Sequence, residues 1–241
     1  MTYYISKLIY ILLSFFDLIL KKLTNKSFLV WLKEIIEEHS YKKKNILNKK
    51  VKFFTPNYIT TWLVDNIFSL EPETLNWIDS FKKKDAIFWD IGASIGLYSV
   101  YAAIKHKKIK IISFEPSTSN LRLLSRNIFI NNLQKRITIN QFPLTKFKNK
   151  YQDFNESKFI EGQGQHSYGV SKNQYGLSFK SSNSYKIYGT SIDHLIDSKI
   201  LKLPDYIKID VDGTEDFILI GASKYLKNKK IKSIFIEMNE Y

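Results

Sequence analysis

The sequence has no cysteine, and among its 241 residues it has only 9 glycines and 5 prolines. Without cysteine the chain has no disulfide bonds, no thiolate ligands for a metal ion and no cysteine nucleophile. The same absence leaves the redox compartment undetermined. Nothing in the sequence therefore points to thiol chemistry.

The sequence also lacks a long uninterrupted apolar run. The most apolar segment, LIYILLSFFDLIL, lies within residues 3–22 and is interrupted by Asp17, whereas a membrane-spanning helix needs ~20 largely apolar residues. Lys7 and the pair Lys21 and Lys22 flank it, as interfacial cations do. No small-residue cleavage site follows, which disfavours a signal peptide. Two interpretations stay open: a helix associated with the membrane surface, or a helix packed on the rest of the chain.

The overall composition predicts one α/β domain with extensions. Apolar residues make up 44% of the chain and aromatic residues 15%, which is enough for one core and is not typical of disorder. The formal net charge is +14, but most of the excess is lysine spread along the chain. The clusters at 42–44 and 82–84 are typical of solvated helix ends or loops. We therefore do not take nucleic acid as the expected partner.

We expect three parts: a hydrophobic helix over residues 1–26, a helical cover over 27–85 and the principal domain over 86–241. Within the cover, the spacing of apolar residues predicts a helix over Phe28–Lys50, and another helix begins near Pro72. We expect the cover to lie over one edge or the mouth of a pocket in the principal domain.

The stretch FWDIGASIGLYSVYAA, residues 88–103, predicts a strand, a tight turn and a helix. Asp90 ends the strand, and Gly92 and Gly96 lie in the turn, where glycine lets backbone amides approach a ligand closely. The spacing D-x-G-x-x-x-G lacks the third glycine of the dinucleotide fingerprint G-x-G-x-x-G. A carboxylate at this point repels a pyrophosphate but pairs with an ammonium. The turn therefore favours S-adenosylmethionine over a dinucleotide.

Two further strands place candidate ligand contacts beside this turn. The strand KIISF ends at Phe114 and is followed by Glu115 and Pro116. Glu115 lies roughly 20 residues beyond the glycine turn, the spacing at which an acidic side chain accepts both hydroxyls of a ribose. The next strand, RITIN, is followed by Phe142, which we expect either to stack on an adenine ring or to pack in the core.

The segment that follows, through Tyr188, is rich in Gly, Ser, Asn and Tyr and lacks helical periodicity. This composition favours loops or an antiparallel flap that faces the substrate. His166 lies there among glycines and polar residues. It is a candidate general base or substrate ligand, and a plain surface histidine is the alternative.

The segment PDYIKIDVDGTE, residues 204–215, predicts a central strand with Lys208, Asp210 and Asp212 on one side. Buried charges are costly unless they are paired or meet a ligand, so we interpret this face as functional, with a purely structural ion-pair network as the alternative. Asp210 follows at the carboxyl end of the strand, where open α/β sheets bind ligands. It is the first candidate for the base that removes a hydroxyl proton, followed by Asp212 and His166, and the pattern requires no metal ion.

Several of these motifs occur in the order found in the FkbM family of S-adenosylmethionine-dependent methyltransferases, which the sequence resembles from about Glu71 to Glu240. The motifs are EPETL at 71, FWDIGASIGLYS at 88, FEPSTSNLRLLSRNIFINN at 114, TSIDHL at 190, IKIDVDGTEDFILIGASKYL at 207 and IFIEMNE at 234. The resemblance implies an α/β, Rossmann-like class I methyltransferase fold with a mostly parallel twisted sheet and helices on both faces. We expect a last strand over residues 231–238 and no C-terminal hairpin after it.

The resemblance also implies S-adenosyl-L-methionine as the cofactor and O-methylation of a sugar, a glycan or another small hydroxyl acceptor. The residues expected to bind the cofactor are Glu71, Asp90, Gly92, Ala93, Gly96, Glu115, Pro116, Phe142 and Asp210. We expect a cytoplasmic location, with the inner face of the membrane as the place of any membrane association. Three other functions stay open: a nucleic-acid methyltransferase, an NAD-dependent oxidoreductase and a non-catalytic binding scaffold.

Overall fold

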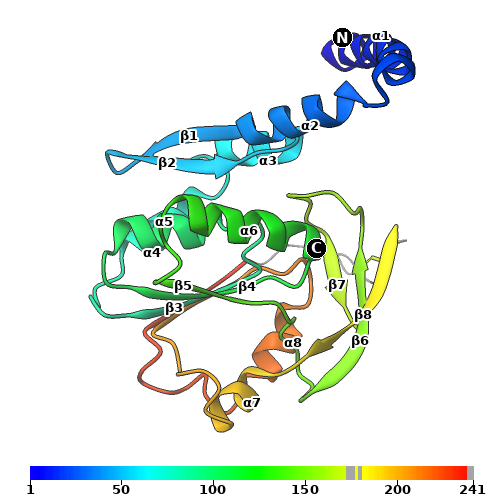
Figure 1. The fold of residues 1–241 in the computed structure, drawn as a ribbon. Coiled ribbons are helices and arrows are strands. Elements are labelled where there is room, and N and C mark those ends of the chain that lie inside the picture. The colour runs from blue at the N-terminus through cyan, green and yellow to red at the C-terminus, as the bar shows by residue number, and fades with distance from the viewer. Residues whose placement is uncertain (172–176, 179–180, 238–241) are drawn as a thin grey trace. The chain divides into compact units, whose positions relative to one another are not determined.

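The computed structural model describes residues 1–171, 177–178 and 181–237, and the chain forms two compact units, Met1–Tyr41 and Lys42–Tyr241. The first unit consists of the helices α1 (Thr2–Thr24) and α2 (Phe28–His39). The second unit contains the other elements, starting with β1 (Tyr41–Ile46) at the boundary (Figure 1).

The centre of the second unit is a parallel sheet with the strand order β10-β9-β3-β4-β5. Its strands are β3 (Ile87–Ile91), β4 (Lys110–Phe114), β5 (Ile137–Asn140), β9 (Tyr206–Ile209) and β10 (Ser233–Ile236). The order reverses at β3, because β4 pairs with one side of it and β9 with the other. Open α/β sheets bind ligands at such a reversal. The predicted Rossmann-like fold is confirmed.

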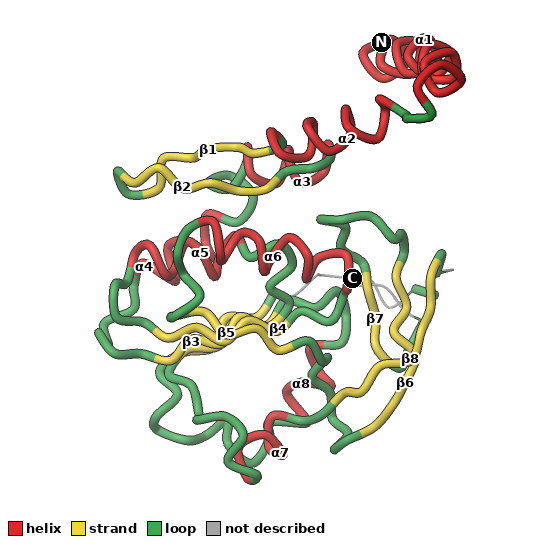
Figure 2. The backbone as a smooth tube through the Cα atoms, viewed as in Figure 1, coloured by secondary structure: helices red, strands yellow, loops and turns green. Residues whose placement is uncertain are grey.

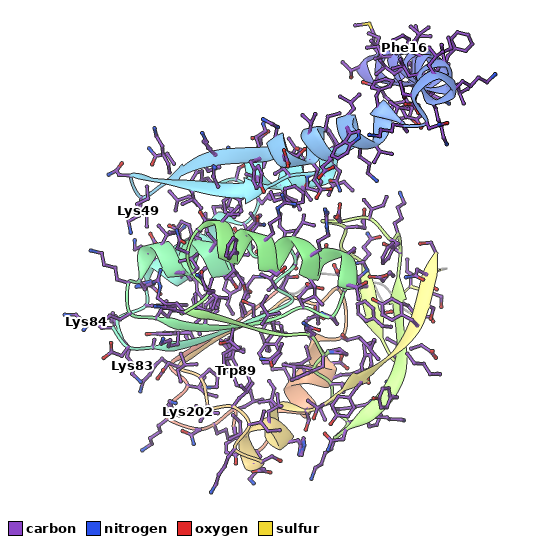
Figure 3. The ribbon with its side chains drawn as sticks, in the orientation of Figure 1. Phe16, Lys49, Lys83, Lys84, Trp89 and Lys202 are labelled. Carbon is purple, nitrogen blue, oxygen red and sulfur yellow. The ribbon has the colours of Figure 1, made fainter. Side chains whose placement is uncertain are left out.

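Helices cover both faces of this sheet (Figure 2). One face carries α4 (Pro72–Asp79), α5 (Leu97–Lys105) and α6 (Thr118–Ile130), and the other carries α7 (Ile192–Asp197) and α8 (Glu215–Ile220). The core beneath α7 and α8 is apolar and includes Trp89 (Figure 3) and its strand neighbours Ile91, Ile207 and Ile209. Alternation along the strands turns the intervening residues to the opposite face, towards α5.

That opposite face contains a buried polar row. Asp90 on β3 is in register with Ser113 on β4 and with Lys208 on β9, so these side chains lie next to one another across the sheet. All of them are at most 1% exposed. The hydroxyl of Ser99 on α5 bonds to both Asp90 and Ser113. Two ionisable side chains, Asp90 and Lys208, are therefore buried in the core directly beneath the glycine turn.

A second sheet follows β5 in the chain. It consists of β6 (Lys150–Glu156), β7 (His166–Tyr168) and β8 (Asn183–Gly189), which pair antiparallel in the order β7-β6-β8. The ends of this excursion meet, since the amide of Thr145 donates to the carbonyl of Thr190 at 2.9 Å and the amide of Thr190 donates to that of Pro143 at 3.2 Å. Of the two alternatives predicted for this segment, loops or an antiparallel flap, the structure has the antiparallel flap.

The helix predicted over Phe28–Lys50 is wrong beyond His39, where α2 ends. A hairpin of β1 and β2 (Lys49–Phe54) replaces it, followed by α3 (Tyr58–Asp65). Leu47 and Asn48 turn the hairpin with φ values of 50° and 61°, the left-handed pair that a two-residue hairpin turn requires. The amide of Phe54 donates to the side chain of Asn127 on α6 at 2.7 Å. This hydrogen bond to α6 favours a strand for the segment before Phe54, although the sequence pattern predicted a helix as far as Lys50.

At the other end of the chain, β10 begins at Ser233 and ends at Ile236, within the strand predicted over 231–238. Glu237 follows it, and Met238 lies outside the described residues. The expectation that no hairpin follows this strand stays a prediction.

Candidate active site

A cavity of ≈ 330 Å³ lies at the carboxyl edge of β3, β4 and β9. This volume falls at the lower end of the range of ~300–1,000 Å³ that is typical of small-molecule sites. The predicted site residues in its lining are Glu71, Gly92, Ala93, Glu115, Pro116, Phe142, His166, Asp210 and Asp212. Asp90 and Gly96 were also predicted to contact the cofactor, but they are not part of this lining.

The turn after β3 brings three strand ends together. Gly92 has a φ of +82°, and a Cβ on it would lie 1.6 Å from the carbonyl oxygen of Asp210, so this position accepts only glycine. The amides of Gly92 and Ala93 both donate to the carbonyl of Phe114 at 3.0 Å. Gly96, at φ +86°, is the N-cap residue that precedes α5. Bare backbone consequently forms the wall of the cavity where β9 approaches β3.

Glu115 is fixed at the tip of β4. Its side chain accepts hydrogen bonds from the amide of Ser94 at 2.7 Å and from the amide of Ser117 at 2.8 Å, one on each carboxyl oxygen. Only 4% of the residue is exposed, and this burial raises the pKa of Glu115 to about 8, although the two amides act to lower it. The structure therefore holds an acidic group on the cavity wall in one orientation.

Asp90 lies in the buried polar row rather than on the cavity wall. Its Oδ2 accepts a hydrogen bond from Ser99, while its Oδ1 has no hydrogen-bond partner among the described residues. Burial raises the pKa of Asp90 and opposes the attraction of the neighbouring Lys208 ammonium. Asp90 therefore affects the cavity through its electrostatic interaction with Lys208, and not by lining the cavity itself.

Lys208 is the cation of this cluster, and it is 1% exposed. Its ammonium forms an ion pair with Asp210 and lies 5.0 Å from the centre of the Tyr98 ring. Burial alone would lower the pKa of Lys208, but the surrounding carboxylates raise it. The side chain therefore stays charged, and it lines the cavity beside Asp210.

Asp210 lies between this ammonium and a second carboxyl group. Burial acts to raise the pKa of Asp210, but Lys208 and a hydrogen bond with Glu237 hold it below its ordinary value. The same hydrogen bond, together with burial, raises the pKa of Glu237 to about 9. At neutral pH, Asp210 is therefore the ionised member of the pair and Glu237 carries the proton that they share.

Glu71 completes the acidic cluster from the start of α4. The hydroxyl of Thr74 donates to it at 2.7 Å, and Tyr98 forms a further hydrogen bond with it. Burial, followed by the charge of Glu71, raises the pKa of Tyr98, which stays protonated. Acidic side chains thus outnumber the Lys208 ammonium in this part of the cavity, which suits a ligand that carries positive charge.

Asp212 lies two residues beyond Asp210, in the left-handed conformation with φ 61°. Its carboxylate accepts a hydrogen bond from the amide of Gln165 at 2.6 Å, which connects the end of β9 to the loop before β7. Burial and the charge of Asp210 raise the pKa of Asp212 to about 6. Asp212 therefore has a basicity close to that required of a proton acceptor at neutral pH.

His166 approaches the cavity from β7. Its Nε2 is 2.8 Å from the carbonyl of Gln163, and its Nδ1 has no hydrogen-bond partner within the described part of the chain. Burial lowers the pKa of His166, against the opposing effect of the Glu156 carboxylate. A neutral ring that donates from Nε2 leaves Nδ1 free to accept a proton or a hydrogen bond.

The loop that carries Gln163 is fixed to two helices. The amide of Gly162 donates to the side chain of Asn120 on α6 at 2.8 Å, and the side chain of Asn57 donates to the carbonyl of Glu161 at 3.0 Å. Gly162, Gln163 and Gly164 line the cavity as a result. The sequence predicted that this segment faces the substrate but identified only His166 in it as a site residue, because the contacts that fix the loop join segments that are far apart in the chain.

Tyr98, Lys208 and Glu237 also line the cavity although none was predicted as a site residue. Lys208 had a visible signal, because it shares the charged side of its strand with Asp210. The sequence signal for Glu237 was weaker, because it consisted only of an acidic residue at the end of the last predicted strand. Tyr98 had none, since an aromatic residue at helical spacing is more often part of the core.

The fold and the cavity define a Rossmann-like α/β protein with an acidic ligand site at the reversal of its sheet. Residues 90–241, more than half of the chain, match the profile of the methyltransferase FkbM domain. The chain therefore belongs to the FkbM methyltransferase family, and the resemblance seen in the sequence is confirmed. A comparison with curated proteins found no match.

Solved structures of methyltransferases share part of the chain path at low sequence identity. A methyltransferase FkbM from Methylobacillus flagellatus KT is 16% identical, with a TM-score of 0.42, over 84% of this chain and 46% of that one. A precorrin-6y C5,15-methyltransferase from Geobacter metallireducens GS-15 is 15% identical, with a TM-score of 0.40, over 69% of this chain and 60% of that one. The chain thus spans about half the length of these proteins.

Proposed function

We propose that the chain is an S-adenosyl-L-methionine-dependent methyltransferase that transfers a methyl group to a hydroxyl oxygen of a small acceptor, such as a sugar or a glycan. The observation that carries this proposal is the cavity at the carboxyl edge of the sheet, where Gly92, Glu115 and Asp210 meet. Membership of the FkbM family supports methyl transfer as the reaction.

The residues present fit this cofactor. Glu115 is held by two amides at the position predicted for the ribose hydroxyls, and Phe142 and Pro116 line the cavity nearby. Glycine at position 92 lets the ends of β3 and β9 approach closely at this wall, since a Cβ there would lie 1.6 Å from the carbonyl oxygen of Asp210. Asp210 and Glu71 offer carboxyl groups to an ammonium and a sulfonium, the charges that this cofactor carries. Bound there, it supplies a methyl group that is activated by the positive charge on sulfur.

The chain itself contributes electrostatics, alignment and a proton acceptor. Asp210 stays ionised beside Lys208 and favours positive charge in the cavity. Alignment of two reactants in one site is worth up to ~7–11 kcal/mol in well-oriented systems. Among the predicted bases, Asp212 has the pKa that best suits proton transfer near neutral pH, at about 6. We therefore assign the hydroxyl proton to Asp212, with His166 Nδ1 as the other acceptor, in place of the first candidate Asp210, whose pKa is lowered by its ion pair with Lys208.

The polar part of the cavity wall supports the proposed class of acceptor. Asn120, Gln163 and Ser167 line the cavity, and their amide and hydroxyl groups suit an acceptor rich in hydroxyls. A sugar presents such groups on several sides. This assignment depends on side chains from α6 and from the flap, whereas the cofactor assignment depends on the sheet.

The test combines a binding measurement with an activity measurement. Titration calorimetry with S-adenosylmethionine should show binding to the full chain, and incubation with a panel of sugars and glycans should give products 14 Da heavier by mass spectrometry. Asp212→Asn should lower kcat by ~10²–10⁴-fold while cofactor affinity stays within a few-fold. Asp216→Asn, an exposed acid on the adjoining helix, is the matched control and should leave kcat unchanged.

The possible outcomes separate the parts of the proposal. A wild-type chain that does not bind S-adenosylmethionine would refute the cofactor assignment. Binding without a methylated product from any hydroxyl acceptor would indicate a binding scaffold. If Asp212→Asn kept full kcat while a His166→Asn variant lost it, the proton acceptor would be His166 instead of Asp212.

A further inference from the structure

Helix α1 (Thr2–Thr24) carries a wide apolar surface that is exposed. Most of its large aliphatic and phenylalanine side chains are between 44% and 77% exposed, whereas Leu13 and Leu20 are half-buried; the exposed ones are Ile5, Leu8, Ile9, Ile11, Leu12, Phe15, Phe16, Leu18, Ile19 and Leu23. Figure 3 labels Phe16 among the side chains that project from this helix. Because an α-helix has 3.6 residues per turn, the exposed run from Leu8 to Leu12 already passes once around the helix.

The acidic residue within α1 has its hydrogen-bond partners inside the first unit. Asp17 is only 9% exposed, and it accepts hydrogen bonds from the hydroxyl of Ser27 at 2.8 Å and from the amides of Phe28 at 2.7 Å and Leu29 at 3.2 Å. These groups form the N-terminus of α2, where the helix dipole favours a negative charge. The charge that interrupts the apolar run is therefore satisfied by α2 rather than by solvent.

We infer that α1 is embedded in the hydrocarbon core of a lipid bilayer and anchors the chain to a membrane. The 18-residue window of highest hydropathy averages 1.6, and only 6% of it is buried within the chain. At ~1.5 Å per residue, the 23 residues of α1 extend about 34 Å, which matches a hydrocarbon layer of ~30 Å if the stems of Lys7, Lys21 and Lys22 lie in the layer and their ammonium groups reach the headgroups. The start of α2 covers the stripe of α1 that contains Asp17, and a protein partner would cover one further stripe, whereas lipid covers all the remaining circumference.

The charges near the end of α1 give the anchor a direction. Lys21, Lys22 and Lys26 follow the apolar segment and outnumber Lys7, which precedes it; lysine side chains at these places reach the headgroups while their stems stay in the apolar layer. Lysines next to a membrane segment mark its cytoplasmic end. The unit formed by residues 42–241 would then lie in the cytoplasm, at the inner face of the membrane. This inference is independent of the proposed methyl transfer.

The test uses the full-length chain, reconstituted from mild detergent into vesicles of phosphatidylcholine with or without phosphatidylglycerol. We expect the protein to float with both kinds of vesicle and to stay bound in high salt and in alkaline carbonate. Leu12→Glu should lower the partition coefficient by about 100-fold, because it places a charge in the hydrocarbon layer. Ile200→Glu, at a residue that is 58% exposed in the second unit, is the matched control and should float as the wild type does.

Other results would overturn the inference. Binding only to phosphatidylglycerol vesicles, with release by salt, would show that lysines hold the protein at the surface without insertion. A protein that stays in solution as an oligomer without detergent would show that second copies cover α1. Equal flotation of Leu12→Glu and the wild type would exclude α1 as the inserted segment. A thermal unfolding curve for each variant establishes that the second unit is folded in every comparison.

Discussion

The pH dependence of S-adenosylmethionine binding tests the role of Glu115 most directly. Its pKa is about 8 in the ligand-free protein because the side chain is buried. Ribose hydroxyls donate hydrogen bonds, and an ionised carboxylate accepts them best. Binding should therefore select the ionised form of Glu115 and release a proton, and the affinity should increase as the pH rises towards the pKa.

The magnitude follows from the fraction of Glu115 that is ionised. With a pKa of about 8, this fraction is ~1% at pH 6, ~50% at pH 8 and ~90% at pH 9, and the apparent Kd scales with its inverse. The Kd should consequently fall by about 50-fold between pH 6 and pH 8 and by less than about 2-fold between pH 8 and pH 9. Titration calorimetry at these pH values, in buffers of different ionisation enthalpy, measures both the affinity and the proton release.

Glu115→Gln separates this effect from other titrating groups. Gln keeps the shape of the side chain but has no proton to lose, so the variant should bind more weakly at pH 8 and lose most of the pH dependence that Glu115 contributes. Asp212, with a pKa of about 6, and Glu237, with a pKa of about 9, remain in the variant and provide its residual slope. If the wild type and Glu115→Gln had the same dependence on pH, Glu115 would not be the group that binding ionises.

The same pKa predicts how the stability of the ligand-free chain depends on pH. The pKa of Glu115 is raised from 4.5 to about 8 on folding, so the folded protein binds more protons than the unfolded protein between these values. The free energy of unfolding should therefore fall as the pH rises through this window, by at most ~5 kcal/mol from this residue. Denaturant unfolding at pH 5 and pH 8 measures the change, and a higher stability at pH 8 that Glu115→Gln does not alter would contradict it.

Two further substitutions test the glycine turn and the buried lysine of the site. Gly92→Ala should destabilise the fold by ~2 kcal/mol or more and abolish cofactor binding, because its Cβ meets the carbonyl of Asp210 and its φ is +82°. Normal calorimetric binding in a stable Gly92→Ala protein would refute the close approach of these strands. Lys208→Met should cost ~3–5 kcal/mol in denaturant unfolding, since it leaves Asp90 and Asp210 without their cation. Lys224→Met breaks an exposed ion pair and should cost under ~1 kcal/mol; equal losses in the two variants would contradict the special role of the buried lysine.

Strand tips were the most predictable part of the site. A short apolar run followed by an acidic residue predicts the end of a buried strand, and parallel strands bring their carboxyl ends to one edge. Glu115 and Asp210 reach the cavity for this reason. Asp90 follows the same pattern, but alternation turns it towards Ser99 and Lys208, beneath the turn instead of into the cavity.

Long-range contacts account for what sequence reasoning missed. The segment after His39 has many lysines and no strong alternation, and only the packing of β2 against α6 makes it a hairpin. Likewise, the contact of Asp17 with the start of α2 is invisible in the sequence, where the residue looks like a break in an apolar run. Such contacts depend on the path of the whole chain, and no local pattern encodes them.

The flap of β6, β7 and β8 has a further consequence. The chain departs from the parallel sheet after Pro143 and returns to it at Thr190, where backbone hydrogen bonds join the two ends. The backbone hydrogen bonds hold the two ends of the excursion together, and they do not themselves depend on the number of residues between the ends. Each doubling of such an excursion adds only ~0.6 kcal/mol of closure entropy. Natural variation or protein engineering can therefore change the length of this excursion, and so which molecules the protein accepts, provided that the contacts of Gln165 with Asp212 and of Gly162 with Asn120 are kept.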